Sequence, residues 1–400
     1  MASRTFTARW LLPIDGPPLA GGLLTIDGEK IVAVEPAGTR FADVDLGDVA
    51  VLPGLVNAHV HLDLSGMRGL APPRLRLPDW LRQVIGHRLS VSPGQVAQDI
   101  HAGLAECIRT GTTLVGDISG DGRSWEILQA SPIRAVVFRE LLGLSGDRLR
   151  AAAQTALTWG RDCQPTPTCR PGYSPHAPYS VSERLLHMVT SQAWQPALPL
   201  AAHLGESAEE LELLASHRGP FVPFLQGLGV WDPEALGSLR DWTHRLNVAD
   251  RVPVLLAHGN YLQPRDVPPG ATVVICPRTH AAFGHPPHPL PRFLEAGIRV
   301  AVGTDGLASN PDLDLLAELR WLRRTTELPG AVILAMGTRA GAEALGFGQE
   351  TGSLTPGKSA DWIVVPLKGA SHDDPHDQLL HGHLPAQRVM CQGRWLLGEI

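Results

Sequence analysis

Several polar residues stand at the ends of apolar, strand-like runs in the middle of the sequence. His59 and His61 form a His-x-His pair, and residues i and i+2 of a strand point to the same side. His203, His258 and Asp305 each close a further apolar run. Imidazole nitrogens with one carboxylate suit a borderline divalent ion, zinc first and iron or manganese after it. The pattern therefore predicts one metal site where several strands end.

The chemistry of such a site is the activation of water. A bound divalent ion lowers the pKa of its water from about 15.7 towards roughly 7. Glu206 stands three residues beyond His203, where strand turns into loop, and is predicted to move a proton beside the ion. The alternatives are a surface glutamate that begins an acidic helix over Glu206–Glu212, and a hydrogen-bonded core histidine at each His position.

Composition excludes several classes of protein. The 400 residues are 44% hydrophobic and 18% charged, which allows a large core and excludes wholesale disorder. Lys plus Arg number 34 against 40 for Asp plus Glu, a net charge of −6, so there is no electrostatic footprint for nucleic acid or an anionic membrane. We expect a small-molecule substrate, and the sequence is compatible with a homo-oligomer.

Cysteine usage and apolar runs indicate the compartment. The five cysteines are scattered and form no Cys-x-x-Cys, which favours a reducing cytoplasm over a disulfide framework. The first residues lack the apolar core of a signal peptide, and no run reaches the roughly 18 apolar residues of a membrane span. We therefore expect a cytoplasmic protein without a membrane segment.

The scarcity of lysine removes one kind of chemistry. The chain has 17 histidines, but its only lysines are Lys30, Lys358 and Lys368. Between Lys30 and Lys358 there is neither a Schiff-base lysine nor a carbamylated lysine to bridge two metal ions.

The middle of the chain alternates between apolar β-rich runs and amphipathic stretches. Eight such runs are predicted as strands: Gly54–His59, Thr112–Val115, Arg134–Phe138, Arg170–Ser174, Leu198–His203, Val252–His258, Thr272–Cys276 and Arg299–Val302. Helices are predicted over Gln95–Arg109, Ser182–Ser191 and Asp312–Arg323, with cap signals at Ser92-Pro93, Ser182 and Asn310-Pro311. This alternation predicts a (β/α)8 TIM barrel, with a doubly wound open sheet as the competitor.

Both ends of the chain are β-rich. Strands are predicted over Thr5–Leu12, Gly22–Ile26, Lys30–Val34, Asp361–Val365, Gln387–Cys391 and Arg394–Leu397. We expect residues 1–52 and 350–400 to form one small β domain together, and residues 53–349 to form the barrel.

Three segments carry a resemblance to a known family. Pro53–His61, Gly303-Thr304-Asp305 and the tail Gly352–Asp361 resemble the amidohydrolase superfamily, in the order His-x-His, His, His, Asp. The resemblance implies a distorted (β/α)8 barrel beside a β-sandwich built from both termini. The missing lysine favours the mononuclear deaminase branch, whose His-x-x-Glu is similar to His203 and Glu206.

This resemblance implies a role for each residue. His59, His61, His203 and Asp305 would bind the ion, and His258 would lie beside it and orient the hydroxide. Glu206 would take a proton from the water and deliver it to a ring nitrogen of the substrate. Metal-bound hydroxide would attack the amine-bearing carbon, Asp305 would help to take the second proton, and ammonia would leave.

The substrate implied by the resemblance is a 6-aminopurine nucleoside derivative. The segment Ser174–Ser180 resembles deaminases of 5′-modified adenosines, in which the histidine matching His176 contacts the nucleoside. Other segments are similar to aminofutalosine deaminases of menaquinone synthesis, with 5′-methylthioadenosine or S-adenosylhomocysteine as the next choices; Asp63 stands where that group has glutamate. Because a futalosine-type substrate carries a carboxylate, an arginine is expected near the site, and the candidates are Arg68, Arg74, Arg76, Arg88 and Arg278, with Arg68 and Arg278 preferred.

Other readings stay open at this point. The same residues suit a hydrolase that removes a halide or amine from a triazine-like or guanine-like ring. A non-catalytic protein of this fold is the third reading, although no expected ligand or proton shuttle is missing. His280, His285 and His288 lie in a Pro-rich loop and are expected to be hydrogen-bonding or surface groups rather than a second metal site.

Overall fold

Eight parallel strands form the centre of the molecule in the computed structural model, which describes residues 3–368 and 374–399. They pair in chain order from β8 to β15. Their bounds are β8 Leu55–Val60, β9 Thr112–Ser119, β10 Arg134–Leu141, β11 Cys169–Pro175, β12 Leu200–Leu204, β13 Val254–His258, β14 Thr272–Ile275 and β15 Arg299–Val302. The predicted barrel is confirmed, and each of its eight predicted strands overlaps an observed one.

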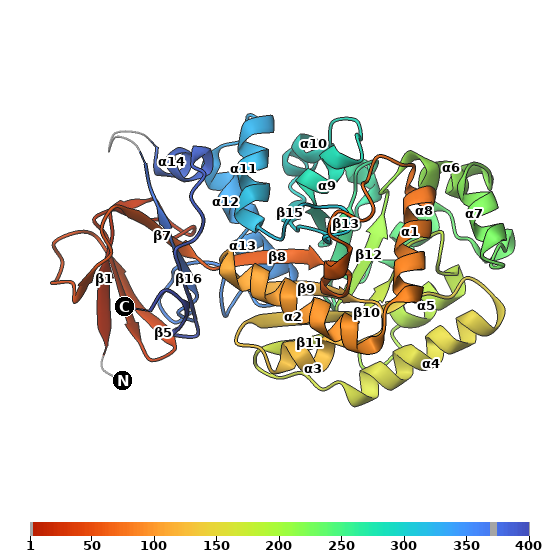
Figure 1. The fold of residues 1–400 in the computed structure, drawn as a ribbon, viewed down its shortest axis with the longest axis horizontal. Helices are drawn as coiled ribbons and strands as arrows, with labels where there is room; N and C mark the ends of the chain where they lie inside the picture. The colour runs from red at the N-terminus through yellow and green to blue at the C-terminus, as the bar shows by residue number, and fades with distance from the viewer. Residues whose placement is uncertain (1–2, 369–373, 400) are drawn as a thin grey trace.

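Helices connect the barrel strands and surround them (Figure 1). Their bounds are α1 Leu77–Ser90, α2 Pro93–Arg109, α3 Ser124–Gln129, α4 Gly146–Asp162, α5 Glu183–Thr190, α6 Ala208–Ser216, α7 Phe221–Gly227, α8 Leu239–Arg245, α9 Pro277–Ala282, α10 Leu290–Glu295, α11 Leu315–Thr325, α12 Gly330–Met336, α13 Arg339–Ala344 and α14 Pro375–His381, with 3-10 turns η1 Leu62–Met67, η2 Pro233–Ala235 and η3 Pro264–Asp266.

Two of the three predicted helix caps are observed. The Ser92 side chain accepts from the amide of Gln95, and that of Ser182 accepts from the amide of Leu185. The third helix begins later than predicted, because Asp314 and not Asn310 accepts a hydrogen bond from an amide of the first turn. Asn310 instead uses its side-chain amide to hold the backbone carbonyl of Thr304, 2.7 Å away, beside the last barrel strand.

The strands from the two ends of the chain form two further sheets. A four-stranded sheet has the order β5-β4-β1-β6, and a six-stranded sheet has the order β18-β17-β16-β7-β2-β3. Their bounds are β1 Arg4–Thr7, β2 Trp10–Leu11, β3 Leu19–Ala20, β4 Leu23–Asp27, β5 Lys30–Glu35, β6 Val44–Asp45, β7 Val49–Pro53, β16 Trp362–Pro366, β17 Arg388–Cys391 and β18 Arg394–Leu397. The predicted strand Thr5–Leu12 was wrong as one element, because β1 and β2 belong to different sheets.

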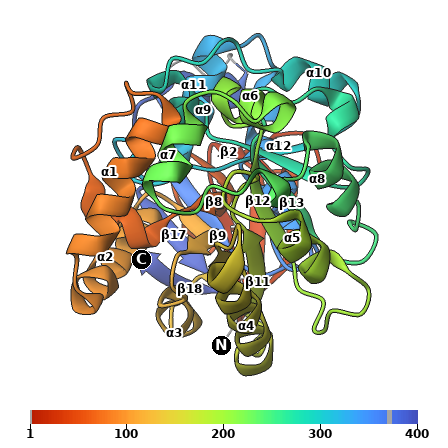
Figure 2. The ribbon, with the colours of Figure 1, turned by 90° about the vertical axis from the view of Figure 1, so that its right-hand side faces the viewer.

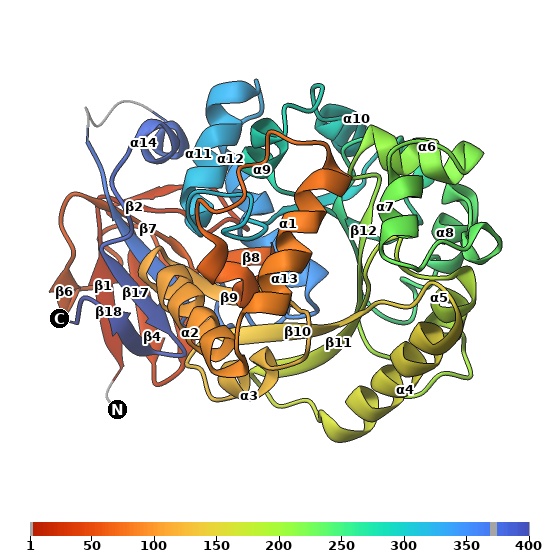
Figure 3. The same cartoon turned by 45° about the vertical axis from the view of Figure 1, so that its right-hand side comes forward.

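The two terminal sheets share an apolar core. Phe6 of the smaller sheet lies against Trp362 of the larger one, with ring centroids 5.1 Å apart. Strands of both chain ends lie side by side there (Figure 3), as the pairing of β16 with β7 requires. We propose that they form one domain with the boundaries 1–52 plus 350–400; residues 1–2, 369–373 and 400 lie outside the described residues. No helix in the described part of the chain is long and apolar enough to cross a membrane.

The barrel closes between β8 and the segment that follows β15. The amide of Asp305 donates to the carbonyl of His59 at 3.0 Å, and the amide of His61 donates to the carbonyl of Asp305 at 3.3 Å. Gly303 permits this approach, since a Cβ atom there would lie 2.6 Å from the His59 carbonyl oxygen and 2.8 Å from its Cβ. The arrow of β8 points away from the terminal sheets (Figure 1), so the closing residues lie at the far end of the barrel.

The contact between β8 and the segment after β15 is called the seam below. We predict that Gly303→Ala disrupts the hydrogen bonds of this seam. The added methyl group meets backbone atoms that cannot rotate away, and overpacking of this kind costs about 1–3 kcal/mol. Thermal unfolding is therefore expected at a lower temperature, together with weaker metal binding. Gly86→Ala is the matched control, since no atom lies within 4 Å of its Cβ position in α1; it should leave stability unchanged or raise it. A Gly303→Ala protein as stable as the control would contradict this account of barrel closure.

Candidate metal centre and active site

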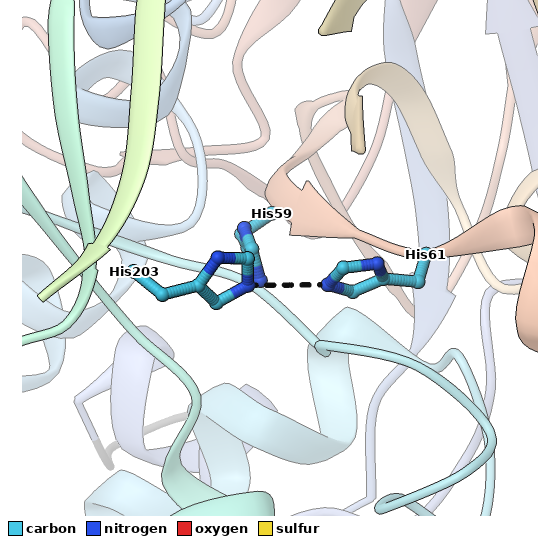
Figure 4. Close-up of side chains that lie close together, drawn as sticks. All are labelled: His59, His61 and His203. Carbon is cyan, nitrogen blue, oxygen red and sulfur yellow. Dashed lines mark hydrogen bonds between the residues drawn. The ribbon is translucent and has the colours of Figure 1, made fainter. Parts of the chain in front are cut away.

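The predicted metal-binding side chains meet at the carboxyl ends of the barrel strands. His59 belongs to β8, and His61 follows it; His203 belongs to β12, His258 ends β13, and Asp305 follows β15. All five residues are buried. Figure 2 looks onto this end of the barrel, and Figure 4 shows the rings of His61 and His203 pointing toward each other beside His59.

The distances between the side chains of this cluster would allow them to bind one shared ion. The Nε2 atoms of His61 and His203 lie 3.3 Å apart. Asp305 Oδ1 lies 3.5 Å from His59 Nε2 and 3.6 Å from His61 Nε2. Two groups of three potential ligand atoms fall within 4.8 Å of one another: one of His59, His61 and His203, and one of His59, His258 and Asp305. The cluster fits a metal site, with His59 common to both groups.

Protonation states at the centre also suit a cation. Burial, followed by the neighbouring His59, lowers the pKa of His61 to about 3, and burial likewise lowers the pKa of His203 well below its usual value. Both rings are therefore neutral at pH 7, which is the form that binds metals. His203 Nδ1 contacts the carbonyl oxygen of His176 at 3.0 Å and donates to it, which leaves Nε2 unprotonated.

Buried atoms without a hydrogen-bond partner give a further test of whether these residues fit a metal ion. His59 Nε2 is buried and has no hydrogen-bond partner. Ser309 donates to Asp305 Oδ2 at 2.5 Å, so Oδ1 is the oxygen left facing the histidines. Burial acts to raise the pKa of Asp305, but the surrounding imidazoles outweigh it and lower the pKa. His59 Nε2 thus has no hydrogen-bond partner and lies beside a carboxylate oxygen. A divalent ion binds to such a pair of nitrogen and oxygen ligand atoms.

The backbone is strained at two of these positions. His258 has a φ of 69° and Asp305 a φ of 59°, a region that side chains other than glycine seldom adopt. Such conformations cost on the order of 1–3 kcal/mol and persist where the surrounding structure determines them. Here the strain turns both side chains from their strands toward the centre.

Glu206 lies beside the metal-binding cluster in the loop after β12. Its carboxyl is buried, and burial followed by the charge of Asp305 raises its pKa well above the usual value. Glu210 of α6 accepts from the amides of Gly205 and Glu206, both at 2.9 Å. Asn260 donates to the Glu206 carbonyl at 2.9 Å. The alternative, a surface glutamate that begins an acidic helix over Glu206–Glu212, is wrong, because Glu206 is buried and α6 begins only at Ala208.

Helix α9 and the Pro-rich loop that follows it contact His258 and Asn260 from the outside of the cluster. His288 Nε2 donates to the carbonyl of His258 at 2.9 Å, and His280 Nδ1 contacts the side-chain oxygen of Asn260 at 3.0 Å. His258 Nε2 in turn lies 3.6 Å from Glu206 Oε1. Among the described residues, the only groups of side chains that could hold a metal ion are the two around His59; His280 of α9, and His285 and His288 of the loop after it, belong to neither.

A cavity of about 400 Å³ leads to the centre. His176 and Glu206 line it, but Arg68 and Arg278 do not. Arg68 instead forms an ion pair with Glu106. Arg278 forms ion pairs with Asp312 and Glu318.

The arginines that line the cavity are Arg88 and Arg148. Arg88 pairs with Glu140 and Asp63. Arg148 of α4 is exposed, and its guanidinium has no partner among the described residues. Much of the remaining lining is apolar and includes Trp80, Val84, Leu89, Leu142, Phe224 and Leu228.

Several functional contacts were not predicted from the sequence. Glu210 and Ser309 each stand four residues after a predicted site residue, and that spacing could have indicated their contacts with the Glu206 amide and with Asp305. Glu140 is the penultimate residue of β10 and could have been found by the same reasoning that selected the histidines at strand ends. Arg148 carries no such signal, since it is one of many arginines on amphipathic helices.

The sequence model of the amidohydrolase family matches residues 50–396. The chain belongs to this family. It is accordingly a hydrolase acting on C–N bonds; relatives of at least 30% identity are named deaminases, and the similar solved structures include both deaminases and a triazine hydrolase.

Three comparisons illustrate the likeness. A protein of Syntrophobacter fumaroxidans named 5-methylthioadenosine/S-adenosylhomocysteine deaminase is 32% identical over 378 residues, which cover 88% of this chain and 82% of that protein. The structure of Helicobacter pylori aminofutalosine deaminase in complex with methylthio-coformycin has a TM-score of 0.86 at 24% identity, covering 98% of this chain and 100% of that one, and shows the common fold. An adenosine deaminase of Xanthomonas campestris with bound zinc has a TM-score of 0.78 at 27% identity, covering 98% and 92%.

We predict that the purified protein binds one divalent ion per chain, and that His61→Ala weakens this binding at least about tenfold because one imidazole is lost. Metal analysis after dialysis against a graded chelator measures the effect. His101→Ala, which alters an exposed histidine of α2, is the control and should retain the ion. Equal metal content in both variants would contradict the assignment of His61.

Proposed function

We propose that the chain is a metal-dependent hydrolytic deaminase of a 6-aminopurine nucleoside with a modified 5′ position. The observation that carries this proposal is a buried Glu206, whose pKa burial and the charge of Asp305 raise well above its usual value, next to a cluster of imidazoles and one carboxylate that line the same cavity. A carboxylic acid that is neutral at pH 7 can give a proton to a weakly basic ring nitrogen.

In this proposal, His59, His61, His203 and Asp305 hold the ion. Zinc is the first choice, with iron or manganese after it; the bound zinc of the Xanthomonas campestris neighbour supports this order. When bound, the ion supplies Lewis-acid activation of a water molecule. The second group of potential ligand atoms includes His258, but we assign His258 to the orientation of the attacking water, since its Nε2 also lies 3.6 Å from Glu206 Oε1.

The protein groups then move protons. Glu206 delivers a proton to a ring nitrogen, which makes the adjacent amine-bearing carbon electrophilic. Asp305, whose pKa is lowered, is a carboxylate; it would accept the remaining proton of the attacking water and pass it to the amine, which then leaves as ammonia. His176 lines the cavity next to His203, with ring centroids 4.9 Å apart, and its role is to contact the nucleoside.

The outer cavity favours a long 5′ substituent. Its wall is apolar, and Arg148 is a cation without a partner at this wall. An aromatic substituent that ends in a carboxylate fits this combination, which supports aminofutalosine as the first choice of substrate. 5′-Methylthioadenosine and S-adenosylhomocysteine are the next choices, in agreement with the names of the relatives. A role in menaquinone synthesis and a cytoplasmic location stay predictions.

We predict that Glu206→Gln lowers kcat for ammonia release about 10²–10⁴-fold, because the amide cannot transfer the proton. Bound metal should be retained, since Glu206 is outside the proposed ligand set. The matched control is Glu212→Gln, which makes the same change on the exposed side of α6. Turnover by Glu206→Gln within threefold of the wild type would refute the proton-transfer role.

The function itself is tested by ammonia release from aminofutalosine, 5′-methylthioadenosine, S-adenosylhomocysteine and guanine, and by chloride release from a chlorinated triazine. We expect activity on the adenosine derivatives, with the highest kcat/KM for aminofutalosine. Activity confined to guanine or the triazine would replace the proposed function by that alternative.

Arg148→Ala should lower kcat/KM for aminofutalosine about three- to tenfold and leave 5′-methylthioadenosine unaffected, because an ion pair at an exposed position contributes modestly. The control is Arg150→Ala, which removes an exposed arginine of the same helix that already pairs with Asp147. An equal effect on both substrates would remove Arg148 from substrate recognition.

A further inference from the structure

Hydrogen bonds hold the backbone of Glu206 on both sides. Its amide donates to Glu210 Oε2 at 2.9 Å, and its carbonyl accepts from Asn260 Nδ2 at 2.9 Å. The carboxyl group of Glu206 has no comparable restraint, since its contact with His258 Nε2 spans 3.6 Å, which is longer than a hydrogen bond. The direction in which this carboxyl points therefore depends on the hydrogen bonds of its backbone.

Asn260 joins the loop after β13 to the loop that carries Glu206. The two loops already share a backbone hydrogen bond, from the amide of Tyr261 to the carbonyl of Gly205 at 3.0 Å. The Asn260 side chain is buried and adds a second link, to the Glu206 carbonyl. An amide side chain can turn over, which exchanges its nitrogen and oxygen, and only one orientation presents a donor to this carbonyl. A partner that donates to Asn260 Oδ1 would select that orientation.

His280 of α9 supplies this partner. Its Nδ1 lies 3.0 Å from Asn260 Oδ1, and its Nε2 lies 2.9 Å from the carbonyl oxygen of Pro286. Because Asn260 Oδ1 can only accept, His280 Nδ1 must carry a proton. A second proton on Nε2 completes the contact with Pro286 in the imidazolium form, whereas the contact with Asn260 needs only the proton on Nδ1. Neither His280 nor Asn260 lines the cavity, so any effect of theirs on a substrate passes through other residues.

We propose that His280 is a positioning residue for the proton transfer by Glu206. It sets the orientation of Asn260, which in turn holds the Glu206 carbonyl and thereby the direction of the Glu206 carboxyl. The contacts from His280 through Asn260 to Glu206 are called the His280 relay below. The effect of the relay on turnover rests on the proposed function, whereas its effect on the backbone of Glu206 does not.

Two substitutions separate the two edges of the His280 ring. The amide nitrogen of asparagine is bonded to Cγ, as Nδ1 of histidine is, so His280→Asn keeps the donor toward Asn260. Glutamine carries its amide one bond further out, so His280→Gln keeps a donor only toward Pro286. His280→Gln should lower kcat for ammonia release about five- to fiftyfold and leave KM within about threefold, since a buried acceptor loses its donor. His280→Asn should retain kcat within about threefold of the wild type.

Amide hydrogen exchange measures the relay without turnover. A peptide that covers Gly205–Glu210 should exchange at least about threefold faster in His280→Gln than in His280→Asn, because the backbone of Glu206 has lost one of its restraints. A peptide from α4 should exchange alike in both variants. This control separates the loss of the relay from a general loss of stability.

Asn260→Ala removes the middle of the relay and gives a second, independent variant. It should lower kcat by a factor similar to that of His280→Gln. The double variant should be no slower than either single one, because residues that act as a unit have non-additive effects. Equal kcat values for His280→Asn and His280→Gln, or multiplied losses in the double variant, would overturn the positioning role.

The failure of this inference differs from that of the proposed function. Wild-type protein that releases no ammonia from the adenosine derivatives overturns the function, and hydrogen exchange then decides on the relay alone. Wild-type protein that deaminates them, with His280→Gln equally fast, retains the function and overturns the positioning role.

Discussion

Closure of the barrel is the constraint on which the site depends. Two backbone hydrogen bonds join β8 to the segment after β15, from Asp305 to His59 and from His61 to Asp305. The same three residues supply potential ligand atoms, so the contact that completes the barrel also sets the distances between them. Gly303 is required because no side chain fits between the two strands. Fold and chemistry are therefore linked at a single seam.

The protein shifts the pKa values of two buried carboxyl groups of the cavity in opposite directions. Burial and the negative charges of Asp305 and Glu210 all raise the pKa of Glu206, and no positive group opposes them. Glu140 faces Arg88, and its pKa is lowered to about 2 although burial opposes this. The first is suited to give a proton and the second to accept hydrogen bonds. Their surroundings, rather than their residue type, separate the two roles.

The sequence was sufficient to predict the barrel and the candidate site residues at the ends of its strands. His59, His203 and His258 close apolar runs, and the alternation of strand and helix places all such ends together. Side chains whose partners lie far along the chain could not be placed in this way. Arg68 and Arg278 stand close to motif residues in the sequence, yet Glu106 and Asp312 hold them away from the cavity. The split of Thr5–Leu12 likewise depends on which later strands the two halves join, since β1 pairs with β4 and β6, and β2 pairs with β3 and β7.

The measurement that tests the account most directly is the X-ray absorption spectrum of the protein loaded with one equivalent of zinc. We expect a first shell of nitrogen and oxygen at about 2.0–2.1 Å, with the outer-shell scattering of about three imidazoles. A sulfur shell at about 2.3 Å, or scattering from fewer than two imidazoles, would contradict a metal site built at the barrel seam.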